Sequence, residues 1–380
     1  MTARASIHLN TAGAGLPAPG VPEAMAAFLA DEARLGPYEA EAGYADQLER
    51  QVYAELAALV GAEPAEIALY GSATDAWCRL VGGLTLPAGA RIWVTPYEYA
   101  GNLIALQLLA ERQGCVIEVV PTVPGGDLDL GWMRDRLDER VALVSLVHMP
   151  SGCGVVQPAE EVGRLLAAAG SPAVYVLDAC QTVGQLPVDV TAVGCHLLTA
   201  AGRKYLRGPR GSGFAFVARE LWDRIRPQFY DLHVAEAVSR HEHRLTVDTA
   251  ARFETAERNN AVVLGLLTAV RHVRSRPLGP APAVFEALLA AVQEIPGVRL
   301  LAPGARRAGI VSFVHPDHPP HRITEGLADH GVNGWVGIGA HTPLYLSVAG
   351  IARFVRTSVH HYNDESDIGV FRRAMKRIVA

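Results

Sequence analysis

Short, continuous apolar runs alternate along much of this 380-residue chain with longer segments of helical character. The runs are rich in β-branched residues and lie at 66–70, 91–95, 116–121, 141–148, 173–178, 196–199 and 212–217. Alanine-rich amphipathic segments, such as 101–113 and 159–169, separate several of them. Apolar strands separated by helices predict a mostly parallel sheet that is covered by helices on both faces. We therefore expect an α/β fold with a seven-stranded sheet.

A proline-rich segment at 274–282 interrupts this pattern. Beyond it the pattern restarts with elements of a smaller α+β unit: a helix near 284–294 and strands near 298–301 and 310–315. We therefore expect a large domain over residues 21–273 and a small domain over residues 274–380. Residues 1–20 are expected to pack with the small domain.

Charge and hydropathy exclude several classes of protein. The formal net charge of −5 gives no basic footprint for nucleic acid or for an anionic membrane. No run of 18 apolar residues occurs, and the first eight residues lack the apolar core of a signal peptide. We expect a cytoplasmic protein with neither a nucleic-acid nor a membrane partner.

The cysteines and histidines do not form a metal-binding pattern. The five cysteines are odd in number and contain no Cys-x-x-Cys pair: Cys78, Cys115, Cys153, Cys180 and Cys195. Buried free thiols are therefore expected rather than disulfides or a zinc site. The three histidines of the segment 315–321 are interspersed with prolines, which favours a turn over a metal site.

Lysine is almost absent from the sequence. Only Lys204 and Lys376 occur, against 32 arginines. Arginine replaces lysine as a surface charge, but it stays protonated and cannot attack a carbonyl. Lys204 lies in a glycine-rich stretch and is therefore a candidate for a Schiff base, whereas Lys376 lies in a basic C-terminal helix end.

Two further signals accompany Lys204. Asp178 ends the apolar run 173–178, where open α/β sheets bind their ligands, and a carboxylate there can pair with a protonated pyridine nitrogen. The segment 71–75 (Gly-Ser-Ala-Thr-Asp) follows a strand and precedes a helix, so its amides and hydroxyls suit a phosphate. Both segments are also ordinary helix-capping sequences.

Eight motifs together resemble those of the class V aminotransferase family, whose members bind pyridoxal phosphate in a fold-type I architecture. They occur in the family's order: His8–Ala12, Gly71–Thr74, Tyr97–Asn102, His148–Gly154, Asp178–Gln181, Gly202–Lys204, Arg252–Glu254 and Arg356–Ser358. The family includes cysteine desulfurases, isopenicillin N epimerase and hercynylcysteine sulfoxide lyase. The segments around His148 and Lys204 are most similar to the lyase and epimerase branch.

The resemblance implies roles for individual residues. Lys204 matches the catalytic lysine that binds the cofactor covalently, Asp178 the partner of the pyridine nitrogen, and Gln181 the neighbour of the phenolic oxygen. The remaining expected cofactor-binding residues are Ser72, Ala73, Thr74, Tyr99, Ser151 and Arg203. The expected substrate-binding residues are Asn10, Ala12, His341 and Arg356, of which Arg356 matches the arginine that binds the substrate carboxylate. A loop hydrogen bond is an equal alternative for His341.

The chain departs from the family's pattern at several positions. Ser151 stands where desulfurases have asparagine, and Ala201 replaces a phosphate-binding serine, for which Arg203 compensates. The resemblance also implies a homodimer with the active site at its interface. The segment after Glu254 departs from the motif by which a partner subunit reaches the phosphate, so the partner's contribution is left open.

The most informative departure is at Thr342. The resemblance places the nucleophilic cysteine of desulfurases at this position, and no cysteine occurs beyond Cys195. A hydroxyl cannot carry sulfur as a persulfide, because that chemistry needs a thiolate. We therefore expect no desulfuration through a protein persulfide.

The expected function is a carbon–sulfur lyase that acts on an S-substituted cysteine, a thioether or sulfoxide, and releases a thiol, pyruvate and ammonia. Similar enzymes process cysteine conjugates in lincosamide antibiotic biosynthesis. Decarboxylation coupled to oxidative deamination to an aldehyde, epimerisation and transamination are the enzymatic alternatives. An inactive scaffold is the non-enzymatic alternative, against which the retention of Lys204, Asp178, Gln181 and Arg356 argues.

Overall fold

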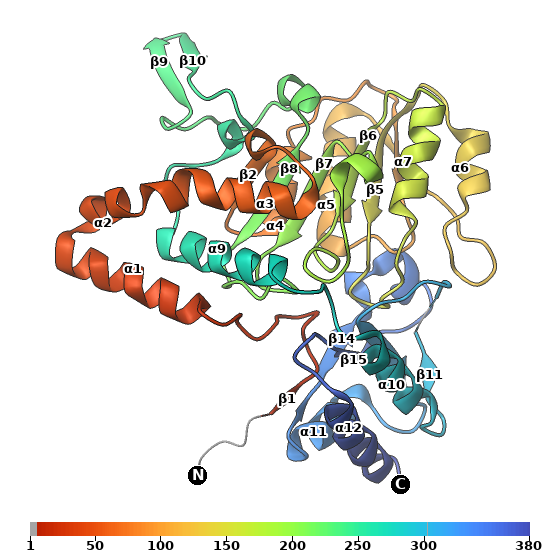
Figure 1. Cartoon of the computed structure of the whole chain (residues 1–380). Helices are drawn as coiled ribbons and strands as arrows, with labels where there is room; N and C mark the ends of the chain where they lie inside the picture. The colour runs from red at the N-terminus through yellow and green to blue at the C-terminus, as the bar shows by residue number, and fades with distance from the viewer. Residues whose placement is uncertain (1–5, 302) are drawn as a thin grey trace.

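The computed structural model describes residues 6–301 and 303–380, and a seven-stranded sheet forms its centre (Figure 1). The strand order is β2-β8-β7-β6-β5-β3-β4. The strands are β2 (Ile67–Tyr70), β3 (Arg91–Val94), β4 (Val116–Val119), β5 (Val141–Val147), β6 (Val174–Asp178), β7 (Leu197–Ala201) and β8 (Gly213–Val217). Each of the seven expected strands is present, and the predicted α/β fold class is confirmed.

Strand direction places several loops at one edge of this sheet. Strands β4, β3, β5, β6 and β7 pair in parallel, whereas β8 is antiparallel to both of its neighbours, β7 and β2. Six strands therefore point the same way and β8 points the opposite way. The loops that follow β2, β5, β6 and β7 consequently meet at their carboxyl ends.

Both faces of the sheet are buried, which explains the continuous apolar runs. On β6, Tyr175 and Leu177 belong to one hydrophobic cluster, and Val174 and Val176 belong to a second cluster on the other face. Successive side chains of a strand point to opposite faces, so a strand buried on both sides is apolar throughout.

Helices form the two outer layers. The second cluster lies against α4 (Ala73–Leu80) and α5 (Ala100–Gln113). The first cluster lies against α3 (Val52–Val60), α6 (Leu130–Arg136), α7 (Ala159–Ala168), α8 (Val190–Val193) and α9 (Asn260–Arg274). The long α1 (Val21–Leu35) packs against α9 and is followed by α2 (Pro37–Gly43). No helix in the described part of the chain is long and apolar enough to cross a membrane.

The C-terminal part forms a second, four-stranded antiparallel sheet. Its order is β11-β12-β15-β14, with β11 (Arg299–Leu300), β12 (Ile310–Val314), β14 (Trp335–Ile338) and β15 (Arg353–Ser358). The helices packed with it are α10 (Pro282–Gln293), α11 (Pro320–Asp329) and α12 (Glu365–Ile378). The N-terminal β1 (Ile7–His8) pairs in parallel with β13 (Val332–Asn333), and Leu9 lies in the same core.

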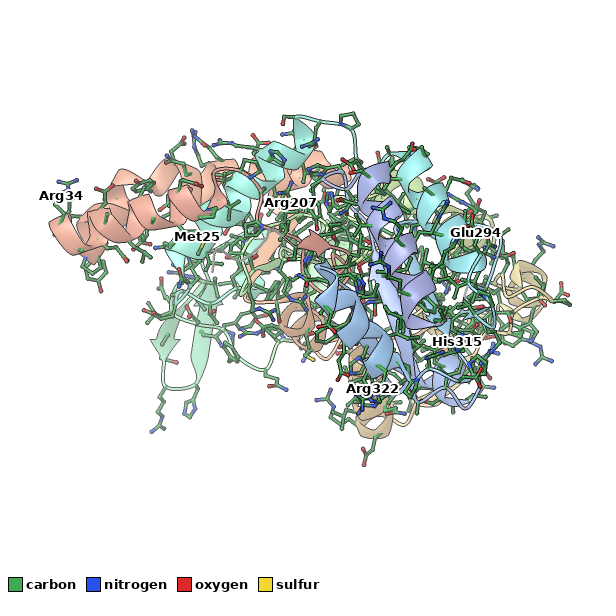
Figure 2. The ribbon with its side chains drawn as sticks, turned by 90° about the horizontal axis from the view of Figure 1, so that it is seen from below. Met25, Arg34, Arg207, Glu294, His315 and Arg322 are labelled. Atoms are coloured by element: carbon green, nitrogen blue, oxygen red, sulfur yellow. The ribbon has the colours of Figure 1, made fainter. Side chains whose placement is uncertain are left out.

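Two further features of the fold are a projecting hairpin and the contacts of Arg207. The hairpin of β9 (Ala235–Ser239) and β10 (Glu242–Leu245) projects away from the sheet (Figure 1). Arg207 lies where the N-terminal segment meets the C-terminal elements (Figure 2). Its guanidinium donates to the carbonyls of Leu16 and Pro17 at 2.7 and 2.8 Å and lies 2.7 Å from Nε2 of His361. The division of the chain at residue 273 stays a prediction.

Candidate active site

A cavity of about 280 Å³ opens at the carboxyl ends of the parallel strands. Val147, Asp178 and Ala201, which lie at the ends of β5, β6 and β7, contribute to its wall. All nine residues predicted to bind cofactor line it: Ser72, Ala73, Thr74, Tyr99, Ser151, Asp178, Gln181, Arg203 and Lys204. The fold therefore brings together residues that are spread over the sequence from Ser72 to Lys204.

The part of the cavity wall formed by the start of α4 is suited to an anion. Ser72 caps helix α4 and accepts a hydrogen bond from the backbone N–H of Asp75 at 3.0 Å, which leaves the first helical amides directed at the cavity wall formed by Ala73 and Thr74. Arg203 and Arg210 line the same cavity. A helix N-terminus combined with guanidinium groups suits a phosphate.

The arginines at the cavity have no carboxylate partners. None of Arg203, Arg210 and Arg356 forms a salt bridge within residues 6–301 and 303–380. Burial lowers the pKa of Arg203, and the neighbouring charge of Arg210 lowers it further. Unpaired cations at a partly buried site are costly, so this arrangement favours bound anions.

The cavity wall also contains a carboxylate, that of Asp178. Asp178 ends β6 and is 7% exposed. Its Oδ1 accepts from the backbone N–H of Cys180 at 2.9 Å, and its Oδ2 accepts from Nδ2 of Asn102 at 2.9 Å. Both bonds orient the carboxylate, which is an acceptor for a protonated ring nitrogen.

Lys204 lies on a tight turn that follows β7. The backbone N–H of Arg207 donates to the Lys204 carbonyl at 3.0 Å, and Arg207 has a positive φ of 61°, the only such non-glycine residue in the described part of the chain. Gly15 packs against the same carbonyl, where a Cβ would lie 2.6 Å from the oxygen. The turn is therefore held by the N-terminal segment, and a side chain at residue 15 would displace it.

Tyr99 covers part of the cavity from the N-terminus of α5. Its ring folds over Gly101, where a Cβ would lie 2.8 Å from Cε1 of the tyrosine. The ring of His341 meets it edge to face, with centroids 6.3 Å apart. Burial and the charge of Asp178 raise the pKa of Tyr99, so its hydroxyl stays protonated.

The residues predicted to bind substrate lie beside the cavity rather than in its wall. Arg356 is 8% exposed, and its guanidinium donates to Oδ1 of Asn10 at 3.1 Å and to the Ser151 carbonyl at 3.3 Å. Its Nε has no partner among the described residues, and burial lowers its pKa to about 10. The carbonyl of Ala12 accepts from Nε2 of Gln181 at 3.0 Å. A buried cation with a free donor suits a carboxylate.

The cysteines correct one expectation. All five are free, as predicted, but only Cys153 and Cys195 are buried; Cys78 is exposed, and Cys115 and Cys180 are partly exposed. Cys180 lines the cavity. It follows Asp178 at the open end of a strand, where the chain leaves the core, which apolar patterning alone does not reveal. Burial of the sulfur and the carboxylate of Asp178 raise the pKa of this thiol far above its usual value.

Sequence reasoning missed several cavity residues, among them Asn102, Thr199 and Arg210. Asn102 lies within the motif Tyr97–Asn102, but its hydrogen bond to Asp178 spans 76 positions. Arg210 belongs to the glycine-rich stretch around Lys204, so a second arginine near a phosphate site is a usable signal. Thr342, which stands at the position of the desulfurase cysteine in the family resemblance, lines the cavity and is 3% exposed. In the described residues, no group of three or more histidine, cysteine or acidic side chains could hold a metal ion.

The model of the family described as "Aminotransferase class-V" matches residues 8–371. The chain therefore belongs to this family, and it is a pyridoxal phosphate-dependent enzyme.

Curated relatives and solved structures agree with this assignment. A probable cysteine desulfurase of Methanothermobacter thermautotrophicus is 27% identical over 332 residues, which cover 85% of this chain and 82% of the relative. A probable cysteine desulfurase of Pyrococcus abyssi is 28% identical over 88% of this chain and 84% of its own length. Against a probable cysteine desulfurase of Mycolicibacterium paratuberculosis, 28% identical over 85% of this chain, the match spans about half of the relative (48%).

Among solved structures, the apo cysteine desulfurase of Thermococcus onnurineus superposes with a TM-score of 0.89 at 26% identity, covering 98% of this chain and 94% of that one. The cystine C–S lyase C-DES in complex with cysteine persulfide gives a TM-score of 0.84 at 22% identity, covering 98% and 97%. At that identity the second likeness supports the fold alone.

The residues that line the cavity suit pyridoxal phosphate, independently of the comparisons with other proteins. The unpaired arginines and the N-terminus of α4 suit the phosphate, and Asp178 is oriented to accept from the ring nitrogen. Gln181 is 2% exposed, and its Oε1 has no partner among the described residues, so this amide has hydrogen-bonding capacity left for a ligand. Lys204 supplies the amine.

Proposed function

We propose that this enzyme is a carbon–sulfur lyase that performs β-elimination on an S-substituted cysteine. The Cβ–S bond breaks, the sulfur leaves with the bonding electrons and takes up a proton as a thiol, and one water is consumed. The other products are pyruvate and ammonia. Bound pyridoxal phosphate supplies the electron sink that stabilises negative charge at the substrate Cα.

The observation that carries the proposal is the chemistry of the cavity wall at Thr342. A hydroxyl there cannot accept a sulfur atom, and the sequence contains no cysteine after residue 195. The one thiol in the cavity, Cys180, has a raised pKa and stays protonated, so it is a poor nucleophile. Sulfur is thus expected to leave with its substituent instead of passing to the protein.

Arg356 and Lys204 have complementary roles in this scheme. The Arg356 guanidinium binds the substrate carboxylate with the donor capacity that its bonds to Asn10 and Ser151 leave free. The Lys204 amine accepts the proton from Cα and delivers one to the departing sulfur.

The relatives support a substrate of the cysteine type. The curated matches described above carry the name cysteine desulfurase. An S-substituted cysteine retains the amino and carboxylate groups that Lys204 and Arg356 are placed to handle. The role in lincosamide biosynthesis and the homodimer stay predictions, as does the cytoplasmic location.

The test is to incubate the loaded enzyme with L-cysteine, cystine, and thioether and sulfoxide conjugates of cysteine, and to identify every product. The proposal is supported by pyruvate formed in equal amounts with the sulfur product of elimination: a thiol from a thioether, a sulfenic acid from a sulfoxide and cysteine persulfide from cystine. An aldehyde with carbon dioxide, a D-configured product, or a keto acid-dependent amino transfer would replace it by the corresponding alternative. Alanine and persulfide from L-cysteine would make the enzyme a desulfurase.

One pair of lysine variants and one cysteine variant serve as controls. Lys204→Ala is expected to abolish turnover, whereas Lys376→Ala, which removes the other lysine from the surface of α12, is expected to leave it unchanged. Cys180→Ser is expected to retain elimination, and a desulfurase activity that vanishes in this variant would assign sulfur transfer to Cys180. A protein that binds pyridoxal phosphate but converts none of the substrates would support the scaffold alternative.

A further inference from the structure

A second buried carboxylate, Glu98, lies behind Asp178. Glu98 immediately precedes the cavity residue Tyr99 and is 0% exposed. It forms no salt bridge with a described residue and belongs to none of the roles considered so far. A buried acid without a cation needs a physical explanation.

The hydrogen bonds of Glu98 link it to Asp178. Its Oε1 accepts from the backbone N–H of Tyr99 at 2.9 Å and from Nδ2 of Asn102 at 3.1 Å. The same Nδ2 donates to Oδ2 of Asp178 at 2.9 Å. An amide nitrogen has two hydrogens, so Asn102 can donate one to each carboxylate. The other oxygen of Glu98 accepts from Oγ of Ser145 at 2.6 Å.

We propose that Glu98 is a positioning residue that acts on the cofactor through Asn102 and Asp178. It fixes the orientation of Asp178 by holding the Asn102 amide. When ionised, it also places a second negative charge behind Asp178, which strengthens the binding of a protonated ring nitrogen.

The surroundings of Glu98 make its charge responsive to pH. Burial raises its pKa to about 7, the bonds from Ser145 and Asn102 lower it, and the charge of Asp178 raises it again. Three elements pack against the carboxylate: the start of α5 with Tyr99 and Asn102, β5 with Ser145, and β6 with Asp178. Asp178 is the charged group among these partners.

The protonation state of Glu98 determines how strongly a cationic ring is held. Below a pH of about 7, Glu98 is neutral and contributes orientation only. Above it, Glu98 is ionised, and the cation on the ring is held by two carboxylates. Since the two events are linked, a bound cationic ring also favours ionisation of Glu98.

The decisive variant is Glu98→Gln, which keeps the shape of the side chain but removes its charge. Its amide oxygen can still accept from Tyr99 and Asn102, and its NH2 can face Oγ of Ser145, a hydroxyl that accepts as well as donates. The affinity of the variant and of the unmodified protein for pyridoxal phosphate is measured by fluorescence titration between about pH 5.5 and about pH 9. The absorbance spectrum of the loaded protein is recorded in parallel. The ratio of the two dissociation constants is expected to be near one at acidic pH and about fivefold at alkaline pH.

A buried carboxylate elsewhere provides the matched control. Glu254 is also buried, its pKa is also raised to about 7 by burial, and it accepts from the backbone N–H of Leu69 at 2.7 Å. It is salt-bridged to Arg258 instead of being linked to Asp178. Glu254→Gln is expected to give a ratio that does not change with pH.

A second variant tests the proposal if Glu98→Gln folds poorly. Ser145→Ala removes a donor that lowers the pKa of Glu98, so the pH-dependent step in affinity and spectrum should move to higher pH. An unchanged step in Ser145→Ala, or a Glu98→Gln ratio that is constant over the whole pH range, would overturn the proposal. These measurements need no substrate, so their outcome is independent of whether the enzyme is a lyase.

Discussion

The basic and the acidic groups at the cavity are held in different ways. Arg203, Arg210 and the first amides of α4 lack anionic partners among the described residues. Asp178, and Glu98 behind it, accept hydrogen bonds from neighbouring groups on both carboxylate oxygens. The basic groups are therefore free to bind an anion, whereas the carboxylates are already oriented. This difference suits a cofactor that carries both a phosphate and a basic nitrogen.

The largest effect is expected when the negative charge of Asp178 is removed. In Asp178→Asn the charge is lost, and one donor, from Asn102 or Cys180, faces the new amide nitrogen instead of an acceptor. We expect turnover of the best substrate to fall on the order of 10²–10³-fold. Steady-state kinetics and the absorbance of the bound cofactor measure the effect. Unchanged turnover would show that the charge of Asp178 does not influence the reactivity of the cofactor.

The next largest effect is expected at Arg356. Arg356→Lys keeps the charge but loses the planar pair of donors, so kcat/KM should fall about 10–100-fold, mainly through KM. Arg353→Lys changes an exposed arginine of the same strand and is the control that should behave like the unmodified enzyme. An equal loss in both variants would point to a disturbed strand rather than to carboxylate binding.

The contributions of Arg203 and Arg210 to pyridoxal phosphate binding can be measured separately. Arg203→Gln should weaken pyridoxal phosphate binding about 10-fold, because Arg203 is partly buried and its interaction is poorly screened. Arg210 is exposed, so Arg210→Gln should cost only about 2–3-fold, and added salt should remove this difference. Fluorescence titrations at low and high salt provide the measurement. A larger loss for Arg210 would reverse the assignment.

The smallest effect concerns the stability of the cofactor-free protein. The pKa of Glu98 is raised in the folded state, so its stabilising contribution is present at low pH and is lost as the pH rises through about 7. Between pH 6 and pH 8 the loss due to Glu98 is on the order of 1 kcal/mol in the free energy of unfolding. Glu254, whose pKa is also raised to about 7, contributes a loss of the same sign. In Glu98→Gln only the part due to Glu98 should disappear, as urea unfolding at the two pH values would reveal. An identical pH dependence of the unfolding free energy in both proteins would contradict a raised pKa of Glu98 in the folded state.

The success of sequence reasoning differs between the fold and the site. All seven strands of the large sheet were predictable. Six of them are largely buried and therefore mostly apolar, and the edge strand β4, whose two ends are exposed, is still recognisable by its β-branched residues. The cavity residues that were found stand next to a strand end or a glycine-rich turn, as Asp178 and Lys204 do. Glu98 was missed because its partner Ser145 lies 47 positions away, and no local pattern distinguishes it from a solvent-exposed glutamate.

The substrate side was the harder part to predict. Arg356 was identified through the family resemblance, but its bond to Asn10 spans 346 positions. The state of Cys180 was mispredicted because exposure at a strand end depends on how neighbouring loops fold. Long-range contacts of this kind are determined by the topology of the two sheets and not by propensity.

The pairing of segments far apart in the sequence has a consequence for the order of folding. β1 pairs with β13, Asn10 bridges to Ser358, and the backbone N–H of Ala12 donates to Oγ of Ser358 at 2.9 Å. Residues 7–12 can therefore reach their final positions only after residues 332–358 have been synthesised. The seven strands of the large sheet lie between Ile67 and Val217 and can pair earlier. We therefore expect the turn that carries Lys204 to form before Asn10 is fixed beside Arg356.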